Sequence, residues 1–284
     1  MGEAKRRKTL NSSTRHAMLR SLFDKHSIDA SSPGFYDNPG FIQQEKRNPL
    51  FLENYAIWVR DQPYTVRYMK QVREVLPRFC TLIHKHLSTD ALLGNCKQVN
   101  LAANRFLDRL GIWSYVAGGS LTVSLTNHPE LGPRYLRLVD HLDDPCGITG
   151  HFWLVIPPFQ CVDLTARLQR WDHRHFIEEI PSTVVIESAT LFRAREVDII
   201  GPGAGDNTIK KFQAAILDLP RFQRQGFSAF RAAVGNTELE YVPQGIVAAN
   251  EPLEIIGSGG GFEALKIWNE TIAPAFGAEK ISHK

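Results

Sequence analysis

The chain has 284 residues, of which 43% are hydrophobic and 22% charged, and its net charge is +3. This composition excludes a disordered chain, and the small net charge gives no indication of a nucleic-acid partner. No apolar run approaches the ~18 residues of a membrane span, the charged first residues lack the apolar stretch of a secretory signal, and the four cysteines are too sparse for a disulfide scaffold. We therefore expect a cytoplasmic globular protein with reduced thiols and no membrane partner.

The first segment, residues 1–46, differs in composition from the rest of the chain. It begins with a basic run, Lys5 to Lys8, and contains two turn-forming stretches, Ser31–Gly34 and Asn38–Gly40. Apolar residues three to four positions apart predict a short helix over 15–25. We expect a basic, partly disordered tail and linker, whose solvated charges make at most weak contact with nucleic acid.

The next segment has the pattern of amphipathic helices. Apolar residues at helical spacing predict helices between Leu50 and Leu87, with Pro63 and Pro77 as starts or breaks. A further helix is predicted from Cys96 to Leu110, because apolar residues continue along one of its faces. Gly111 follows it at the position where a glycine in the left-handed conformation ends a helix.

Beyond Gly111 the pattern changes to strands. The predicted strands are 115–117, 121–123, 151–156, 161–165, 183–186 and 189–192. A glycine-rich break at 201–205 then precedes a helix over 209–217. We divide the chain into the tail at 1–46, a core with N-terminal helices at 47–200 and a mixed C-terminal extension of unclear class at 201–284.

Three residues occur in the chain order that nucleophilic cysteine catalysis requires. Cys96 begins a predicted helix, His151 begins a predicted strand and Asp163 lies on the next strand. A cysteine attacks as its thiolate, which the positive end of a helix favours. A neighbouring histidine takes up the thiol proton, and an aspartate fixes the ring's tautomer and stabilises its cation. We predict that Cys96, His151 and Asp163 fill these roles.

Strand geometry sets a condition on the pairing of His151 with Asp163. If residues 157–160 alone formed the turn, Leu154 would pair with Asp163 and place it on the face opposite His151. A connection of odd length or a bulge would instead align Trp153 with Asp163 and make His151 its diagonal neighbour, within side-chain reach. The prediction therefore requires an irregular connection between the two strands.

Four segments resemble the transglutaminase-like core over residues 94–166. They are Gly94-Asn-Cys96, the helix end Leu107-Asp-Arg-Leu-Gly-Ile112 with Tyr115-Val-Ala-Gly-Gly119, Gly150-His-Phe-Trp-Leu154, and Val162-Asp-Leu-Thr165. The family often has an aromatic residue where Lys97 stands and proline where Leu164 stands. The resemblance implies an α+β, papain-like fold in which the catalytic cysteine begins a helix packed on an antiparallel sheet. It also implies a Cys-His-Asp triad on Cys96, His151 and Asp163.

These residues predict a cysteine-dependent hydrolase or transamidase, of the thiol protease or amidase type, acting on the amide bond of a protein or peptide-like substrate. Backbone N–H groups at the helix start are the main candidates for binding the oxyanion, and the side chain of Asn95 or Gln98 is a further candidate donor. The chemistry needs no cofactor and no metal, so we expect neither.

Other interpretations of the same residues remain open. A similar triad serves thioester-dependent N-acyltransferases, although Leu93-Gly94-Asn95 lacks their Arg-Gly-Gly motif, and a papain-like scaffold can be an inactive binding module. Zinc could bind four donors that lack a Cys-x-x-Cys pair: Cys146, His151, Cys161 and Asp163. Gly257–Gly261 has the outline of a phosphate loop without its lysine, and we interpret it as a flexible turn.

Overall fold

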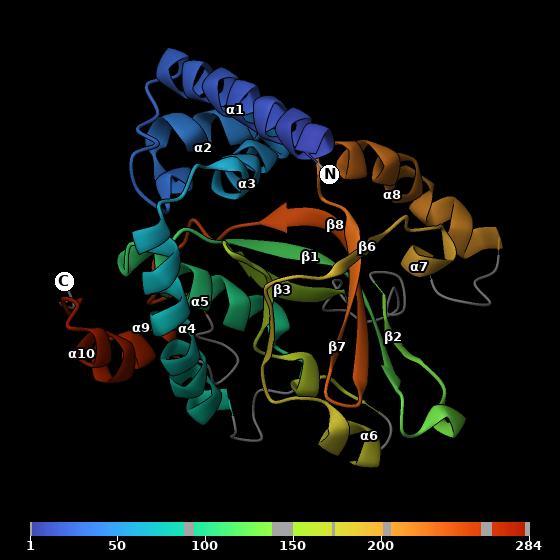
Figure 1. Cartoon of the computed structure of the whole chain (residues 1–284). Coiled ribbons are helices and arrows are strands. Elements are labelled where there is room, and N and C mark those ends of the chain that lie inside the picture. Colours follow the sequence, from blue (N-terminus) through green and yellow to red (C-terminus); the bar gives the residue numbers. More distant parts are fainter. Residues whose placement is uncertain are drawn as a thin grey trace.

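The computed structural model shows an α+β protein built on one antiparallel sheet with helices on both of its faces (Figure 1). It describes residues 2–87, 94–137, 150–171, 174–200, 206–256 and 263–281. For some of these, residues 2–12 among them, only the backbone is described. Within these ranges, no helix has both the length and the apolar character needed to cross a membrane.

The helices and strands alternate in blocks along the chain. The helices are α1 Gly2–Lys25, α2 Pro39–Arg47, α3 Leu52–Asp61, α4 Val66–Leu87, α5 Cys96–Arg109, α6 Arg174–Glu179, α7 Val197–Ile200, α8 Asp206–Arg224, α9 Ala264–Ile267 and α10 Ala273–Phe276. The strands are β1 Tyr115–Leu125, β2 Arg134–Leu136, β3 His151–Ile156, β4 Phe159–Asp163, β5 Val184–Ile186, β6 Thr190–Phe192, β7 Ala229–Val234 and β8 Thr237–Val247.

The sheet has the order β5-β4-β3-β1-β8-β7-β6, and β2 pairs with the distal half of β1. All of these pairs are antiparallel. The hairpin of β7 and β8 comes from the segment 201–284, and β8 lies directly beside β1. The segment 201–284 therefore contributes strands to the central sheet.

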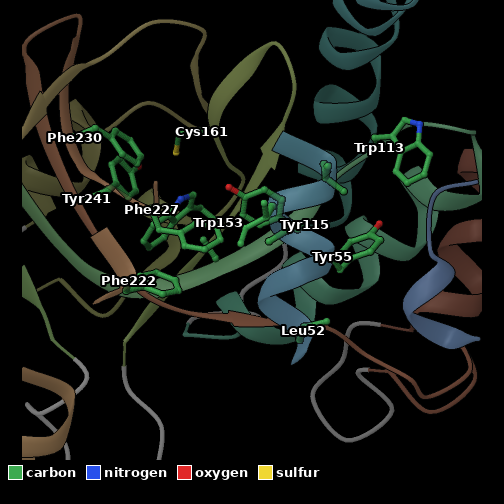
Figure 2. Close-up of a cluster of buried hydrophobic side chains, with 14 of the residues drawn as sticks. Leu52, Tyr55, Trp113, Tyr115, Trp153, Cys161, Phe222, Phe227, Phe230 and Tyr241 are labelled. Atoms are coloured by element: carbon green, nitrogen blue, oxygen red, sulfur yellow. The ribbon is translucent and has the colours of Figure 1, made fainter. Parts of the chain in front are cut away.

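Two large clusters of buried side chains lie on the two faces of the sheet. Tyr115 and Ala117 belong to the cluster that α1 and α3 cover, while Val116 belongs to the cluster that α4, α5 and α9 cover. This alternation is the period-two pattern of a strand buried on both faces. Figure 2 shows part of the first cluster, where Trp153, Phe230 and Tyr241 from three different strands lie together.

The later part of the N-terminal segment is packed into the first cluster. Phe23, Phe35, Tyr36 and Phe41 are each at most 5% exposed. Their rings contact one another and the helix α3; the centroids of Phe35 and Tyr55, for example, are 4.9 Å apart. These aromatic residues lie between turns and show neither helical nor strand spacing, so the sequence pattern does not predict their burial. The side chains of the basic run in α1 lie outside the described residues.

The helix α5 has the ends that the sequence predicts, and it is fastened to β3. Gly111 has a φ of +71° and the N–H of Ile112 donates to the carbonyl of Leu107, as in a glycine-terminated helix. Near the other end, Asn100 Nδ2 donates to the carbonyl of Cys96 at 2.8 Å and to that of Phe152 at 2.9 Å. The amide of Asn100 thus fixes the first turn of α5 against the start of β3.

A carboxylate on α5 should make the stability depend on pH. Burial raises the pKa of Asp108 to about 7, although Tyr36 Oη donates to it at 2.6 Å. The unfolded chain loses this proton near pH 4, so stability falls as the pH rises from about 4 to about 7. We expect Asp108→Asn to raise the free energy of unfolding by about 1–3 kcal/mol at pH 8 and by much less at pH 4.5.

Urea unfolding at the two pH values measures this difference. The exposed Asp24→Asn is the matched control and should leave both values unchanged. An equal effect of Asp108→Asn at pH 4.5 and pH 8 would show that its carboxylate does not carry the penalty.

Candidate active site

The structure brings Cys96, His151 and Asp163 together. Cys96 is the first residue of α5, His151 is the first residue of β3 and Asp163 is the last residue of β4, the neighbour of β3 in the sheet. Cys96 is 5% exposed, and His151 and Asp163 are fully buried. Three residues that are distant in sequence therefore share one enclosed site, which we call the triad.

The Cys96 thiol lies at the start of β3. Its Sγ donates to the carbonyl oxygen of Gly150, the residue before His151, at 3.8 Å. His151 has the same strand parity as Trp153, on the face opposite α5. The thiol and the ring can meet at the first residue of β3, because no earlier residue of that strand stands between them.

His151 and Asp163 form a buried ion pair. Nε2 of His151 is 2.5 Å from Oδ2 of Asp163. Burial alone would lower the pKa of His151, but the charge and hydrogen bond of Asp163, with a smaller contribution from Cys96, raise it to about 10. Among the described residues Nδ1 has no hydrogen-bond partner, so it is the ring nitrogen left for the thiol proton. The pair holds the ring as a cation beside the sulfur at neutral pH.

The carboxylate of Asp163 is surrounded by donors. Its Oδ1 accepts from the N–H groups of Thr165 and Ala166, both at 2.9 Å, and its Oδ2 accepts from Tyr241 Oη at 2.9 Å. Burial would raise the pKa of Asp163, but His151 and these donors hold it below its usual range. Asp163 therefore stays charged and does not compete with His151 for the proton.

Tyr241 is the site residue that sequence reasoning missed. It comes from β8, and its fully buried ring lies 4.9 Å from that of Trp153 and 5.1 Å from that of Phe230 (Figure 2). The alternation of acidic and apolar residues over 238–241 could have indicated an inward-facing tyrosine. Nothing in that pattern points to Asp163.

The pairing of β3 with β4 confirms the irregular connection that the triad requires. Leu154 pairs with Val162, an offset that aligns Trp153 with Asp163, whereas Ile156 pairs with Phe159. The register therefore shifts between Leu154 and Ile156. This irregularity places His151 and Asp163 on the same face as diagonal neighbours.

The two side-chain candidates for binding the oxyanion flank Cys96. Asn95 is half-buried at the N-cap position of α5, and Gln98 is exposed on the first turn. The backbone N–H groups of Cys96 and Lys97 belong to the same turn, where no carbonyl of the helix can accept from them. A carbonyl oxygen held over this turn would meet several donors at once.

The zinc interpretation gains no support from the described residues. Within them, no group of three His, Cys, Asp or Glu side chains could hold a metal ion, and His151 and Asp163 bind each other. Cys146, the fourth donor of the zinc interpretation, lies outside the described residues, as does Gly257–Gly261. Cys80, Cys96 and Cys161 are free thiols.

No protein-family model matches the chain, and neither a curated protein nor a solved structure matches it. The assignment of a role to the triad therefore depends on its geometry and chemistry.

Proposed function

We propose that the protein is a cysteine-dependent hydrolase or transamidase, of the thiol protease or amidase type, with a papain-like, transglutaminase-like core. The observation that carries this proposal is the buried pair of His151 and Asp163, 2.5 Å apart, beside a cysteine at the first position of a helix. A buried charged pair is costly unless its charge serves a partner, and the thiol of Cys96 is that partner.

The reacting form is an ion pair in which Nδ1 of His151 already holds the Cys96 proton, so a thiolate lies beside an imidazolium. The sulfur attacks the amide carbonyl and forms a C–S bond, and the oxyanion accepts from the N–H groups of the first turn of α5. His151 then returns the proton to the nitrogen, the C–N bond breaks and the amine leaves. The product on the protein is an acyl-thioester of Cys96.

The second half of the reaction releases the acyl group. His151 removes a proton from an incoming water, whose oxygen attacks the thioester carbonyl; the C–S bond breaks and the acid leaves with the thiol restored. A primary amine in place of water gives transamidation with the same proton transfers. In a reducing cytoplasm, where we place the protein, the thiol would persist between turnovers.

A second candidate is a binding module that keeps the scaffold without turnover. The specific observation in its favour is burial, because Cys96 is only 5% exposed and His151 is not exposed at all. A thioester-dependent N-acyltransferase would share the first half-reaction and differ in its acyl donor. Reactivity of the thiol separates the binding module from both enzymes.

Selective labelling by iodoacetamide at pH 7 tests the proposal. Burial raises the pKa of Cys80 to about 12 and that of Cys161 well above its ordinary value, so neither thiol should react. In a Cys146→Ala background we expect peptide mass spectrometry to find the label on Cys96. The rate should exceed that of glutathione at the same pH.

The control for this labelling is Cys96→Ala, which should remove the modification. Labelling of Cys96 no faster than that of glutathione would contradict an enzymatic site and favour the binding module.

A further inference from the structure

A short turn, residues 164–171, follows β4 and is hydrogen-bonded to the residues that precede Cys96. At one end, the N–H groups of Thr165 and Ala166 donate to Asp163. At the other, the N–H of Gly94 donates to the carbonyl of Leu168 at 3.0 Å. The turn over 164–171 is therefore held against both Asp163 and the start of α5.

Bonds within the turn make it rigid. Gln169 Nε2 donates to the carbonyl of Thr165 at 2.8 Å, and the indole N–H of Trp171 donates to the carbonyl of Ala166 at 2.8 Å. Both side chains fold back onto the start of the turn. These hydrogen bonds therefore hold the backbone of residues 164–171 in place beside the proposed nucleophile, Cys96.

Three cationic residues lie in this turn and at the start of α5, which the turn contacts. Arg167 and Arg170 belong to the turn, and Lys97 directly follows Cys96. Nε of Arg170 lies 3.7 Å from the position that a Cβ would take on Gly94, two residues before Cys96. Arg170 is exposed, while Arg167 and Lys97 are half-buried.

Among the described residues, no carboxylate forms an ion pair with Lys97, Arg167 or Arg170. Other arginines are paired: Arg105 with Asp37, and Arg221 with both Glu53 and Asp218. Unpaired positive charge at a reactive centre attracts anions and lowers the energy of a bound carboxylate.

We infer that the triad acts on acidic peptides, in which a carboxylate lies within about one residue of the amide that Cys96 attacks. This inference rests on the proposed function and adds its substrate class. A glutamate or aspartate side chain, or a terminal carboxylate, provides the same group. The attraction acts between exposed charges, so salt should weaken it.

Two alkylating reagents of similar size test this without a known substrate. Iodoacetate is an anion and iodoacetamide is neutral, and the ratio of their rates at Cys96 reports the local charge. Lys97→Gln and Arg170→Gln should each lower the iodoacetate-to-iodoacetamide ratio about 3-fold at low salt, and the double variant about 10-fold. In 1 M NaCl the differences should shrink toward parity.

Both reagents react with the same thiolate, so any change in its amount cancels in the ratio of the two rates. Arg193→Gln is the matched control, because it removes one exposed arginine directly after β6, at the far edge of the sheet from β4. It should leave the ratio unchanged.

Peptide competition is a second test. A hexapeptide with two glutamates should slow the labelling of Cys96 by iodoacetamide more than the same peptide with two glutamines does.

The outcomes separate the two claims. Rapid labelling by iodoacetamide, with a ratio that the double variant does not change, would overturn the acidic substrate class and leave the proposed function standing. Labelling of Cys96 no faster than that of glutathione by either reagent would overturn the proposed function, and the substrate class with it.

Discussion

His151→Ala should slow the alkylation of Cys96 by iodoacetamide about 30-fold at pH 6, and this loss should disappear at pH 9. At pH 6 a free thiol with the ordinary pKa of about 8.5 is ~0.3% thiolate, whereas in the proposed triad the His151 cation stabilises the thiolate. A thiolate stabilised by a cation is also a weaker nucleophile, which offsets about a tenfold part of that gain. At pH 9 a thiol with the ordinary pKa is itself largely ionised, so the loss disappears, and the variant should react up to about tenfold faster because its thiolate is the stronger nucleophile.

The size and burial of His151 call for a second variant. His151→Ala leaves a cavity beside Trp153, and the charge of Asp163 loses its partner. His151→Gln fills more of the space and should show the same loss of rate at pH 6. Circular dichroism would establish that each variant is folded. Equal rates at pH 6 in folded wild-type and variant proteins would remove His151 from the site.

Asp163→Asn should slow the same reaction about 10-fold at pH 6, less than His151→Ala does. The variant removes the charge that raises the pKa of His151, and its amide can hold the wrong tautomer of the ring. A thiolate and an imidazolium still attract each other, so part of the reactivity should survive. Alkylation kinetics at pH 6 measure this loss.

The structure changes what the sequence alone predicts for the stability of this variant. Replacing a carboxylate that has no partner by an amide would change the free energy of unfolding by about 1 kcal/mol. Asp163, however, accepts hydrogen bonds from Thr165, Ala166 and Tyr241 as well as from His151. We expect Asp163→Asn to lose about 2–4 kcal/mol of unfolding free energy. Unchanged alkylation in a folded variant would exclude Asp163 and point to Asp140, Asp143 or Asp144, which lie outside the described residues, or to no third member.

The parts of the site that the sequence predicts are those with local signals. The start of α5 at Cys96 and its end before Gly111 follow from apolar spacing and a glycine. The strand that begins at His151 follows from a short apolar run. The need for an irregular connection before Asp163 follows from the alternation of side chains along strands, and the register of β3 and β4 confirms it.

The parts that the sequence does not predict depend on contacts between distant segments. The order of strands in the sheet places β8 beside β1 and brings Tyr241 to Asp163, and no local pattern encodes that order. The burial of Phe23 and Phe41 likewise depends on the helix α3, because turns and charges dominate their own segment. Hydrophobic periodicity reports which side of an element is buried and leaves its partner unspecified.

The measurement that tests the central claim most directly is the rate of Cys96 alkylation by iodoacetamide as a function of pH, in wild-type protein and in His151→Ala. If the triad is assembled for catalysis, the wild-type protein should keep most of its reactivity as the pH is lowered from 9 to 6, a range in which the rate of a free thiol such as glutathione falls steeply. The rate of His151→Ala should fall as steeply as that of glutathione. Superimposable profiles in which wild-type protein and variant both fall as glutathione does would contradict the account.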